Sequence, residues 1–279
     1  MGLRIATNAA SMVAQRALST SSANQAKSYQ RLASGSRITD AGDDAAGLSI
    51  SESLRAQIRS MGQAERNAND GVSFVQVAEG GLNEIGNMLI RLRELGVQAA
   101  SDTIGDKERS YIDAEVQSLV QEIDRTANVT NFNGTSLLNG NSEKDELQFQ
   151  VGIRKEEGDS DRIVFEPNDY NVKVDELDIA DVSYATIDDA RENLDRVDAA
   201  MDKVFGTRAK LGAVQNKLHS TINNLGIAKE NLAIARSRIA DTDVAAETAD
   251  MVRGSILQQA GISVLAQANT TPTLALRLL

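Results

Sequence analysis

Large apolar residues recur every seven positions through the second half of the chain. The repeat is unbroken within residues 187–239, where it comprises Val197, Val204, Leu211, Leu218, Leu225, Leu232 and Ile239. A seven-residue repeat of this length is typical of a helix that packs along a left-handed coiled-coil seam. A single helix over this segment would be roughly 80 Å long at the usual rise per residue. We therefore predict one long helix here, which needs a partner of similar length.

A second long helix is predicted in the first half of the chain. Between residues 54 and 99, apolar residues follow one another at helical spacings, as in a helix that buries one face. A shorter helix is predicted over residues 106–127, after a break at Gly105. Only the 54–99 segment is long enough to pair with residues 187–239. We therefore predict a mainly α fold, an antiparallel helical rod or coiled-coil bundle formed by the two halves. Its seam residues are predicted to be Leu54, Ile58, Leu82, Leu89, Val204, Leu211, Leu218, Leu225 and Leu232.

The middle of the chain differs from both helical halves. Residues 131–140 contain two Asn-Gly pairs, which favour tight turns. Residues 147–151 and 162–165 are short runs of strand-forming residues on either side of a polar tip. We predict a small β-hairpin region between the halves, closed by Pro167.

The two ends of the chain, residues 1–40 and 240–279, carry weaker apolar stripes. Small and polar residues interrupt these stripes, so each end has little apolar surface to bury. Ordering one residue costs about 1–2 kcal/mol of backbone entropy, which a narrow stripe in a single chain does not offset. We therefore predict that both ends are largely disordered in the monomer and become helices against other copies. The residues predicted to carry these contacts are Ile5, Met12, Val13, Ile256, Leu257, Val264 and Leu265.

The composition argues against several classes of function. The formal net charge is −11, and the basic residues are interleaved with acidic ones, which argues against nucleic-acid binding. The absence of Cys removes disulfides, thiolate nucleophiles and Cys-based zinc sites. No apolar run is long enough for a membrane span, and the start of the chain lacks an apolar signal core. We expect either a cytoplasmic protein or one exported without a cleaved signal peptide.

Residues with catalytic or metal-binding chemistry are few. His219 is the only histidine, and a helical seam provides it with neither a nucleophile turn nor an oxyanion hole. Asp40, Asp43 and Asp44 lack the spacing of a calcium loop. We predict instead that Asp43 or Asp44 caps the long helix that follows. We expect no enzyme activity and no catalytic, cofactor-binding or metal-binding residues.

Several long blocks of the sequence are similar to bacterial flagellin. The first half contributes LASGSRITDAGDDAAGLSISESLRAQIRS (Leu32–Ser60), QAERNANDGVSFVQVAEGGLNEI (Gln63–Ile85) and EIDRTANVTNFNGTSLLNG (Glu122–Gly140). The second half contributes LGAVQNKLHSTINNLGIAKENLAIARSRIADTD (Leu211–Asp243) and ILQQAGISVLAQAN (Ile256–Asn269). Blocks of this length, in the right order at both ends, are far more specific than a short motif. The chain therefore resembles the flagellin family over nearly its whole length.

The resemblance implies a four-part subunit of the bacterial flagellar filament. Residues 1–40 and 240–279 would form an inner tube, and residues 41–186 and 187–239 would form the rod around it. The variable outer region that the family inserts between its halves is missing, which implies a minimal subunit. The implied partners are other copies of the chain, the flagellar export apparatus, an export chaperone, the filament cap and the hook-junction proteins.

The resemblance also implies where the subunit acts and what recognises it. It implies a structural protein exported unfolded into the flagellum outside the cell, serving swimming motility, with naked, sheathed and periplasmic filaments left open. Arg91, Leu95 and Glu115 match the family's patch for the host flagellin-sensing Toll-like receptor. Ordinary surface charge pairing of Arg91 with Glu115 is the simpler interpretation. The alternative function is a hook–filament junction protein, which would cap a filament rather than propagate it.

Overall fold

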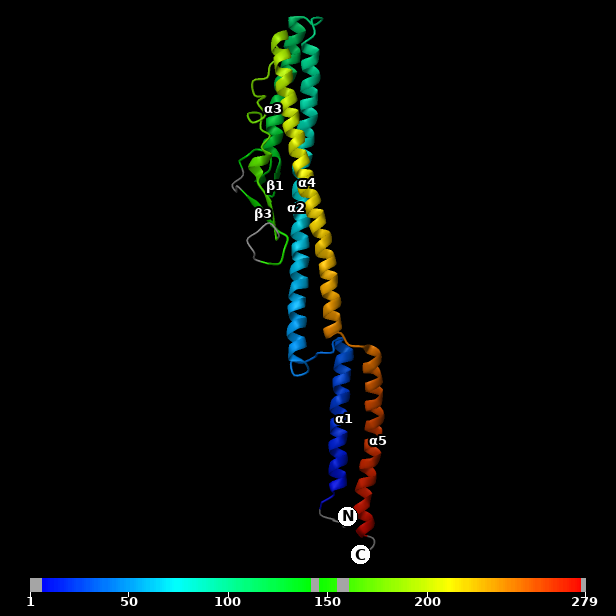
Figure 1. Ribbon diagram of the computed structural model, residues 1–279. Helices are drawn as coiled ribbons and strands as arrows, with labels where there is room; N and C mark the ends of the chain where they lie inside the picture. The colour runs from blue at the N-terminus through cyan, green and yellow to red at the C-terminus, as the bar shows by residue number, and fades with distance from the viewer. Residues whose placement is uncertain (1–6, 142–145, 155–160, 277–279) are drawn as a thin grey trace. The chain divides into compact units, whose positions relative to one another are not determined.

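The computed structural model describes residues 7–141, 146–154 and 161–276 (Figure 1). The chain is mainly α-helical with a small β region in the middle, as predicted. Its helices are α1 (Ala9–Ser34), α2 (Ala45–Ala99), α3 (Asp106–Val129), α4 (Ile187–Ala240) and α5 (Val244–Leu276). The short elements between α3 and α4 are β1 (Asn131–Phe132), β2 (Thr135–Ser136), β3 (Leu147–Gln150), β4 (Arg162–Phe165) and the 3₁₀ helix η1 (Pro167–Tyr170).

The residues divide into two compact units by their contacts. Unit 1 comprises residues 1–58 and 230–279, and unit 2 comprises residues 59–229. Residues 41–58 and 230–239, which the sequence assigns to the rod, thus group with the terminal helices. The long helices α2 and α4 each contribute residues to both units.

In unit 2 the helices α2 and α4 run antiparallel (Figure 1). Two ion pairs across the helices mark their register. Lys229 Nζ lies 2.6 Å from Glu65 Oε2, and Arg93 Nε lies 2.6 Å from Asp198 Oδ1. Residue numbers fall along α4 as they rise along α2, which is the pairing predicted from the two apolar stripes.

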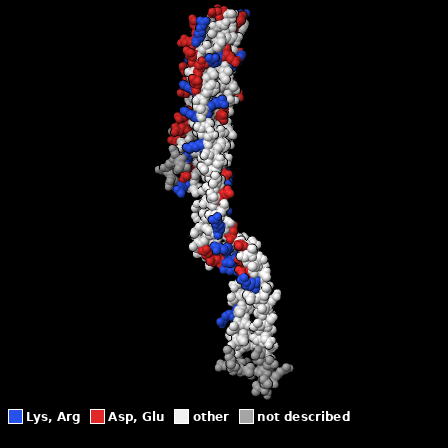
Figure 2. Space-filling view, turned by 45° about the vertical axis from the view of Figure 1, so that its right-hand side comes forward, with Lys and Arg blue, Asp and Glu red and all other residues white. Residues whose placement is uncertain are grey.

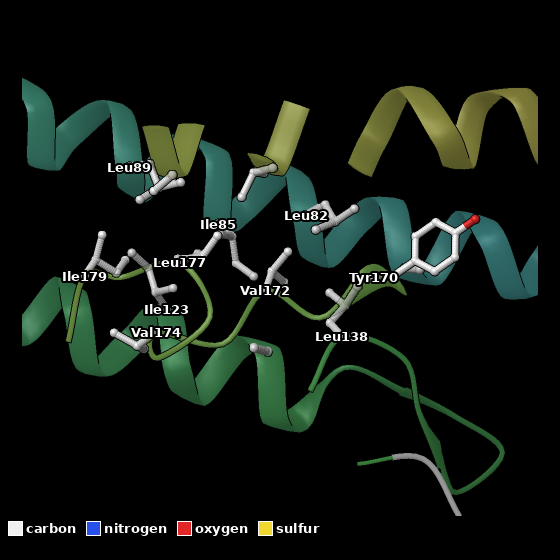
Figure 3. Close-up of a cluster of buried hydrophobic side chains, with 14 of the residues drawn as sticks. Leu82, Ile85, Leu89, Ile123, Leu138, Tyr170, Val172, Val174, Leu177 and Ile179 are labelled. Carbon is white, nitrogen blue, oxygen red and sulfur yellow. The ribbon is translucent and has the colours of Figure 1, made fainter. Parts of the chain in front are cut away.

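The core of unit 2 lies where α2 and α3 meet the segment between η1 and α4, residues 171–186 (Figure 3). The helices contribute buried Leu82, Ile85, Leu89 and Ile123, and the segment contributes buried Val172, Val174, Leu177 and Ile179. The buried residues of this segment alternate with others only in short pairs, such as Val172 with Val174, and no regular element was predicted here. It covers apolar surface on two helices at once and thereby completes the core within a single chain.

Two small antiparallel hairpins lie beside this core. β1 pairs with β2, and β3 pairs with β4 so that Leu147 is opposite Phe165. Asn133 and Gly134 make the first turn with φ angles of 49° and 81°, a conformation that favours an Asn-Gly pair. Phe74 of α2 packs edge-on against the rings of Phe132, Phe149 and Phe165. The helix therefore anchors both hairpins.

In unit 1 the terminal helices α1 and α5 lie side by side and antiparallel (Figure 1). Asn8, which caps α1, donates from Nδ2 to the carbonyl oxygen of Ala268 at 2.9 Å. Ser21 Oγ donates to the carbonyl oxygen of Gly254 at 3.4 Å. The side chains buried in this pair are small, namely Ser11, Ala14, Ser28 and Ala268. Within residues 7–141, 146–154 and 161–276, no helix combines the length and the hydropathy that crossing a bilayer requires.

Candidate assembly surfaces

The terminal helix pair exposes large apolar side chains. Of the residues predicted to contact other copies, five are between 56% and 65% exposed, namely Met12, Val13, Ile256, Leu257 and Val264. Leu265 is partly buried, and Ile5 lies outside the described residues. The side chains buried between α1 and α5 are small, and the large ones remain exposed.

Four further exposed apolar residues on these helices were not among the predicted contact residues, namely Tyr29, Val244, Val252 and Ile262. With Met12, Val13, Ile256, Leu257 and Val264 they form a set that we term the terminal stripe. It holds nine of the nineteen large apolar side chains that are exposed among the described residues. Soluble monomers seldom concentrate apolar surface in this way, so the stripe is a candidate protein contact.

An open groove of about 820 Å³ lies between α1 and α5. Its walls combine Val13 and Leu257 of the terminal stripe with small polar residues. The Lys and Arg residues of the two helices all line it, namely Arg16, Lys27, Arg31 and Arg253. The terminal pair thus gathers its basic charge along one groove.

The two aspartates that precede α2 have different partners. Asp44 Oδ1 accepts a hydrogen bond from the backbone N–H of Gly47 at 2.8 Å, so Asp44 caps the helix. Asp43 accepts from Lys27 Nζ at 2.5 Å and from the backbone N–H and hydroxyl of Thr39 at 3.3 and 3.1 Å. The contact with Lys27 is the main cause that lowers the pKa of Asp43 to about 2. Of the two predicted candidates, Asp44 is therefore the cap.

The linkers that follow α1 and precede α5 are hydrogen-bonded to each other. The backbone N–H of Thr242 donates to the carbonyl oxygen of Gly35 at 3.0 Å, and that of Arg37 donates to Ala240 at 2.7 Å. Gly35 ends α1 with a φ of 67°, the left-handed conformation that favours glycine. These bonds hold one end of α1 beside one end of α5.

The two units carry very different charge. Unit 1 contains ten basic and nine acidic residues, whereas unit 2 contains nineteen basic and thirty-one acidic residues. The formal charges are therefore +1 and −12. Figure 2 shows charged side chains along unit 2, whereas the terminal helices are mostly uncharged. The acidic surface of unit 2 is a solvated one, while the terminal helices are suited to apolar contacts.

The predicted seam residues lie at two levels of burial. In unit 2 the side chains are buried at Leu82, Leu89, Val204, Leu211, Leu218 and Leu225. Leu54, Ile58 and Leu232 belong to unit 1 and are only partly buried. The buried seam residues contribute to the core of the chain itself, which leaves exposed faces of α2 and α4 for other contacts.

The predicted receptor patch is only partly on the surface. Arg91 donates from Nε and Nη2 to Glu115 Oε1 at 3.0 and 2.9 Å, and from Nη1 to Glu94 Oε2 at 3.1 Å. These carboxylates, Glu115 first, raise the pKa of Arg91. Leu95 is 1% exposed, so its side chain lies beneath the surface, and its part in the receptor patch stays a prediction. Its side chain continues the buried face of α2 that contains Leu92.

No centre of chemical catalysis stands out. His219 is exposed on α4. In the part of the chain that the structure describes, no three His, Cys, Asp or Glu residues are grouped so that they could hold a metal ion. The candidate functional site is therefore a set of helix surfaces, with the terminal stripe as its largest apolar part.

Comparison with known proteins gives matches over most of the chain. The family description "Bacterial flagellin N-terminal helical region" matches residues 5–143, and "Bacterial flagellin C-terminal helical region" matches residues 194–279. The flagellar filament 31.3 kDa core protein of Treponema maltophilum is 38% identical over 283 residues, with 98% of each chain covered. A flagellin of Halalkalibacterium halodurans is 40% identical over 253 residues, with 91% of each chain covered.

Two solved structures are similar in fold. Bacillus cereus flagellin aligns with a TM-score of 0.51 at 27% identity, covering 57% of this chain and 88% of its own. A putative flagellar hook-associated protein from Vibrio parahaemolyticus aligns with a TM-score of 0.58 at 15% identity. The second alignment covers 71% of this chain and 100% of the other, and at that identity it concerns the fold alone.

Proposed function

This chain belongs to the bacterial flagellin family, and we propose that its terminal helices assemble with those of other copies to build the flagellar filament. The chain is a structural subunit of that filament, which serves motility. One observation supports the assembly role of α1 and α5: nine large apolar side chains are exposed on a helix pair whose own contact buries only small ones. In this proposal residues 1–40 and 240–279 form the inner tube.

In this proposal assembly completes the ordering of the terminal helices, which form a helix pair within one chain. Each ordered residue costs about 1–2 kcal/mol of backbone entropy. The small residues buried between α1 and α5 offset little of this cost, because burial contributes only about 25 cal/mol per Å² of apolar surface. Neighbouring copies supply the remaining apolar surface when they cover the terminal stripe. A contact that repeats head to tail without closing gives an open helical polymer.

Unit 2 forms the rod around the inner tube in this proposal. Its core is complete within one chain, so it folds before assembly and the exposed faces of α2 and α4 then meet neighbouring rods. The flagellar export apparatus, with an export chaperone, passes the unfolded subunit out of the cell. The filament cap and the hook-junction proteins meet the subunit at the two ends of the filament. The chemistry of this function is association alone, with no enzymatic step.

A hook–filament junction protein is the second candidate function. The sequence leaves it open, and a fold likeness at 15% identity does not choose between the two functions. The 38% identity to a filament core protein over 98% of both chains favours the filament. The two functions differ in one property, since a filament subunit adds to its own kind repeatedly and a junction protein does not.

Seeded polymerisation of the full chain tests the proposal. Purified monomer is mixed with short filament seeds at neutral pH, and growth is followed by light scattering and electron microscopy. We expect long filaments from the unmodified chain and none from Val13→Asp or Ile256→Asp, because each places a charge on the terminal stripe. Tyr111→Asp is the matched control, because Tyr111 is 65% exposed on α3, outside the proposed contacts.

Each result separates the candidate functions. Filaments that grow equally well from the Val13→Asp and Ile256→Asp chains contradict the assembly role of the stripe. An unmodified chain that binds only at the tips of seeds, and stops their growth, supports the junction protein.

Recognition by the flagellin-sensing Toll-like receptor is a separate proposal. Arg91 and Glu115 support it, because their side chains are 48% and 47% exposed, whereas Leu95 would act only from beneath the surface. We expect Arg91→Ala to lower receptor signalling in a reporter cell assay. The matched control is Arg93→Ala, since Arg93 is also 48% exposed and paired with a carboxylate, Asp198. Equal signalling from the Arg91→Ala chain and the unmodified chain contradicts the proposal.

A further inference from the structure

The contact between α1 and α5 does little by itself to fix how the two helices are aligned. Its buried residues are small, and glycines add to its smooth surface. A Cβ atom added at Gly254 would lie 3.6 Å from Gln25, and one added at Gly261 would lie 3.4 Å from Leu18. These are ordinary van der Waals distances, so neither glycine interlocks with the opposite helix. Helices align through side chains that fit between one another, and small residues provide few of them. Besides the hydrogen bonds from Asn8 to Ala268 and from Ser21 to Gly254, another feature must therefore help to set the alignment.

Charged residues gather at the linker end of the helix pair. Lys27 Nζ of α1 lies 2.5 Å from Asp43 Oδ1 in the linker that precedes α2. Arg31 Nη1, one turn further along α1, lies 3.6 Å from Glu247 Oε2 in the first turn of α5. Arg31 Nη2 also lies 4.0 Å from Asp43 Oδ2. Figure 2 shows positive and negative atoms clustered at the linker end of the terminal helices, where α1 ends and α5 begins.

These ion pairs differ from the others on the terminal helices in their burial. The side chains of Asp43 and Glu247 are only 8% and 12% exposed. In the Arg253–Asp250 pair within α5, by contrast, the carboxylate is 57% exposed. An exposed pair contributes little to stability. A nearly buried carboxylate that loses its cation is left without water to replace it, which is a much larger cost.

We infer that Lys27, Arg31, Asp43 and Glu247 form a charged clamp that positions α1 against α5 and so aligns the terminal stripe for assembly. Arg31 lies between both carboxylates and therefore relates three segments, α1, the linker and α5. The hydrogen bonds between the two linkers hold the start of α5 in place. The clamp then determines which face of α1 packs against α5. A shift of α1 by one residue would separate Lys27 from Asp43. The clamp rests on the proposed function of α1 and α5, and its members are positioning residues.

Charge reversal and charge exchange in the full chain test the clamp. Lys27→Asp and Asp43→Lys each place like charges together, and the double variant restores an opposite pair in the reverse sense. We expect each single variant to slow elongation from seeds by about tenfold or more, and the double variant to regain most of the rate, because the loss comes from pairing. The control is Arg125→Asp, which disrupts an exposed pair with Glu122 on α3, outside the clamp and the stripe.

A second readout reports the alignment without requiring filament growth. Because the chain has no Cys, paired cysteines can be introduced at chosen positions. Ser21→Cys with Gly254→Cys tests the observed alignment, and Ser21→Cys with Gln258→Cys tests a shift by one helical turn. We expect the first pair to cross-link preferentially in the otherwise unmodified chain, and this preference to be lost in the Lys27→Asp background. The charge-exchanged background should restore it.

The outcomes distinguish the clamp from the proposed function. A cross-linking preference that is the same in the Lys27→Asp and unmodified backgrounds overturns the clamp. A charge-exchanged chain that assembles as slowly as the single variants also overturns it, because pairing would then not be the cause. Failure of the unmodified chain to elongate seeds overturns the proposed function, and the cross-links still decide for or against the clamp.

Discussion

Unit 2 and the terminal pair of unit 1 are both made of long antiparallel helices, yet they bury very different residues. In unit 2 the helices bury Leu82, Leu89, Leu211 and Leu218, and in the terminal pair they bury Ser11, Ala14, Ser28 and Ala268. Unit 2 thus buries large apolar side chains, whereas the residues described as buried in the terminal pair are all small. The difference shows that one region is completed within the chain, while the other has apolar surface left for partners. The near-neutral charge of unit 1 suits such contacts, because repeated copies of a strongly charged surface would repel one another.

The largest expected effect comes from removing a core side chain of unit 2. We expect Leu89→Ala to lower the free energy of unfolding by about 2–5 kcal/mol, because a fully buried leucine leaves a cavity. Met12→Ala, in the terminal stripe, should change it by less than about 0.5 kcal/mol and instead slow polymerisation. Urea unfolding of the monomer and seeded growth measure the two effects. Equal losses of monomer stability from both substitutions would break the contrast between the units.

A smaller effect is expected from two glycines of α2. A Cβ atom at Gly96 would lie 2.9 Å from a methyl carbon of Leu194 and 3.0 Å from the ring of Tyr184. We therefore expect Gly96→Ala to destabilise unit 2 by about 1–3 kcal/mol. Gly80→Ala is the matched control, because no atom lies within 4 Å of its Cβ position. It should stabilise the helix by about 0.5–1 kcal/mol. Thermal unfolding of both variants measures the difference, and shifts in the same direction would contradict it.

The smallest expected effect is the pH dependence that Asp43 contributes in unit 1. The folded pKa of Asp43 is about 2, below its ordinary value of 3.8, so ionised Asp43 stabilises the folded form. Its contribution is complete above pH 3.8 and is lost as the pH falls through about 2. The groups that face it are Lys27, Arg31 and Thr39. We expect acid titration of filaments to show a weaker dependence in this range for Asp43→Asn.

Thr39→Val provides a graded check on this titration. It removes the hydroxyl that donates to Asp43 and leaves the backbone N–H and Lys27 in place. The midpoint of acid dissociation should therefore move upward, part of the way toward the ordinary pKa of an aspartate. An unchanged acid profile in both variants would exclude Asp43 as the titrating group.

The helices followed from the sequence because their burial is periodic. The seven-residue repeat through Leu211, Leu218 and Leu225 requires a helix with a long partner, and only one other segment was long enough. The predicted strands at 147–151 and 162–165 are present as β3 and β4. An aspartate as the cap of α2 was also predictable, since carboxylates before a helix satisfy free amides. Which aspartate caps α2 was not predictable, because Asp43 pairs instead with Lys27, a residue of α1.

The features that the sequence did not predict concern residues whose neighbours come from distant parts of the chain. The buried segment around Val172 and Leu177 alternates only in short pairs, which predict neither a continuous strand nor a helix. Arg109 is only 1% exposed, with Nη2 donating to the carbonyl oxygen of Ile104 at 2.9 Å, although a charged helical residue is usually expected at the surface. The family resemblance assigns Leu95 to the receptor patch, whereas the helix turns its side chain toward the core.

The sequence by itself determined the helices, the short strands, the absence of disulfides and the family, since each follows from local spacing, composition or long matching blocks. Only the tertiary structure decided which apolar residues are covered and which remain exposed. The stripes of α1 and α5 resemble other amphipathic helices until the pair is seen to close on small residues. The tertiary structure also decided the ionic partners of Asp43 and Glu247, because burial and charge pairing depend on residues brought together from both ends of the chain.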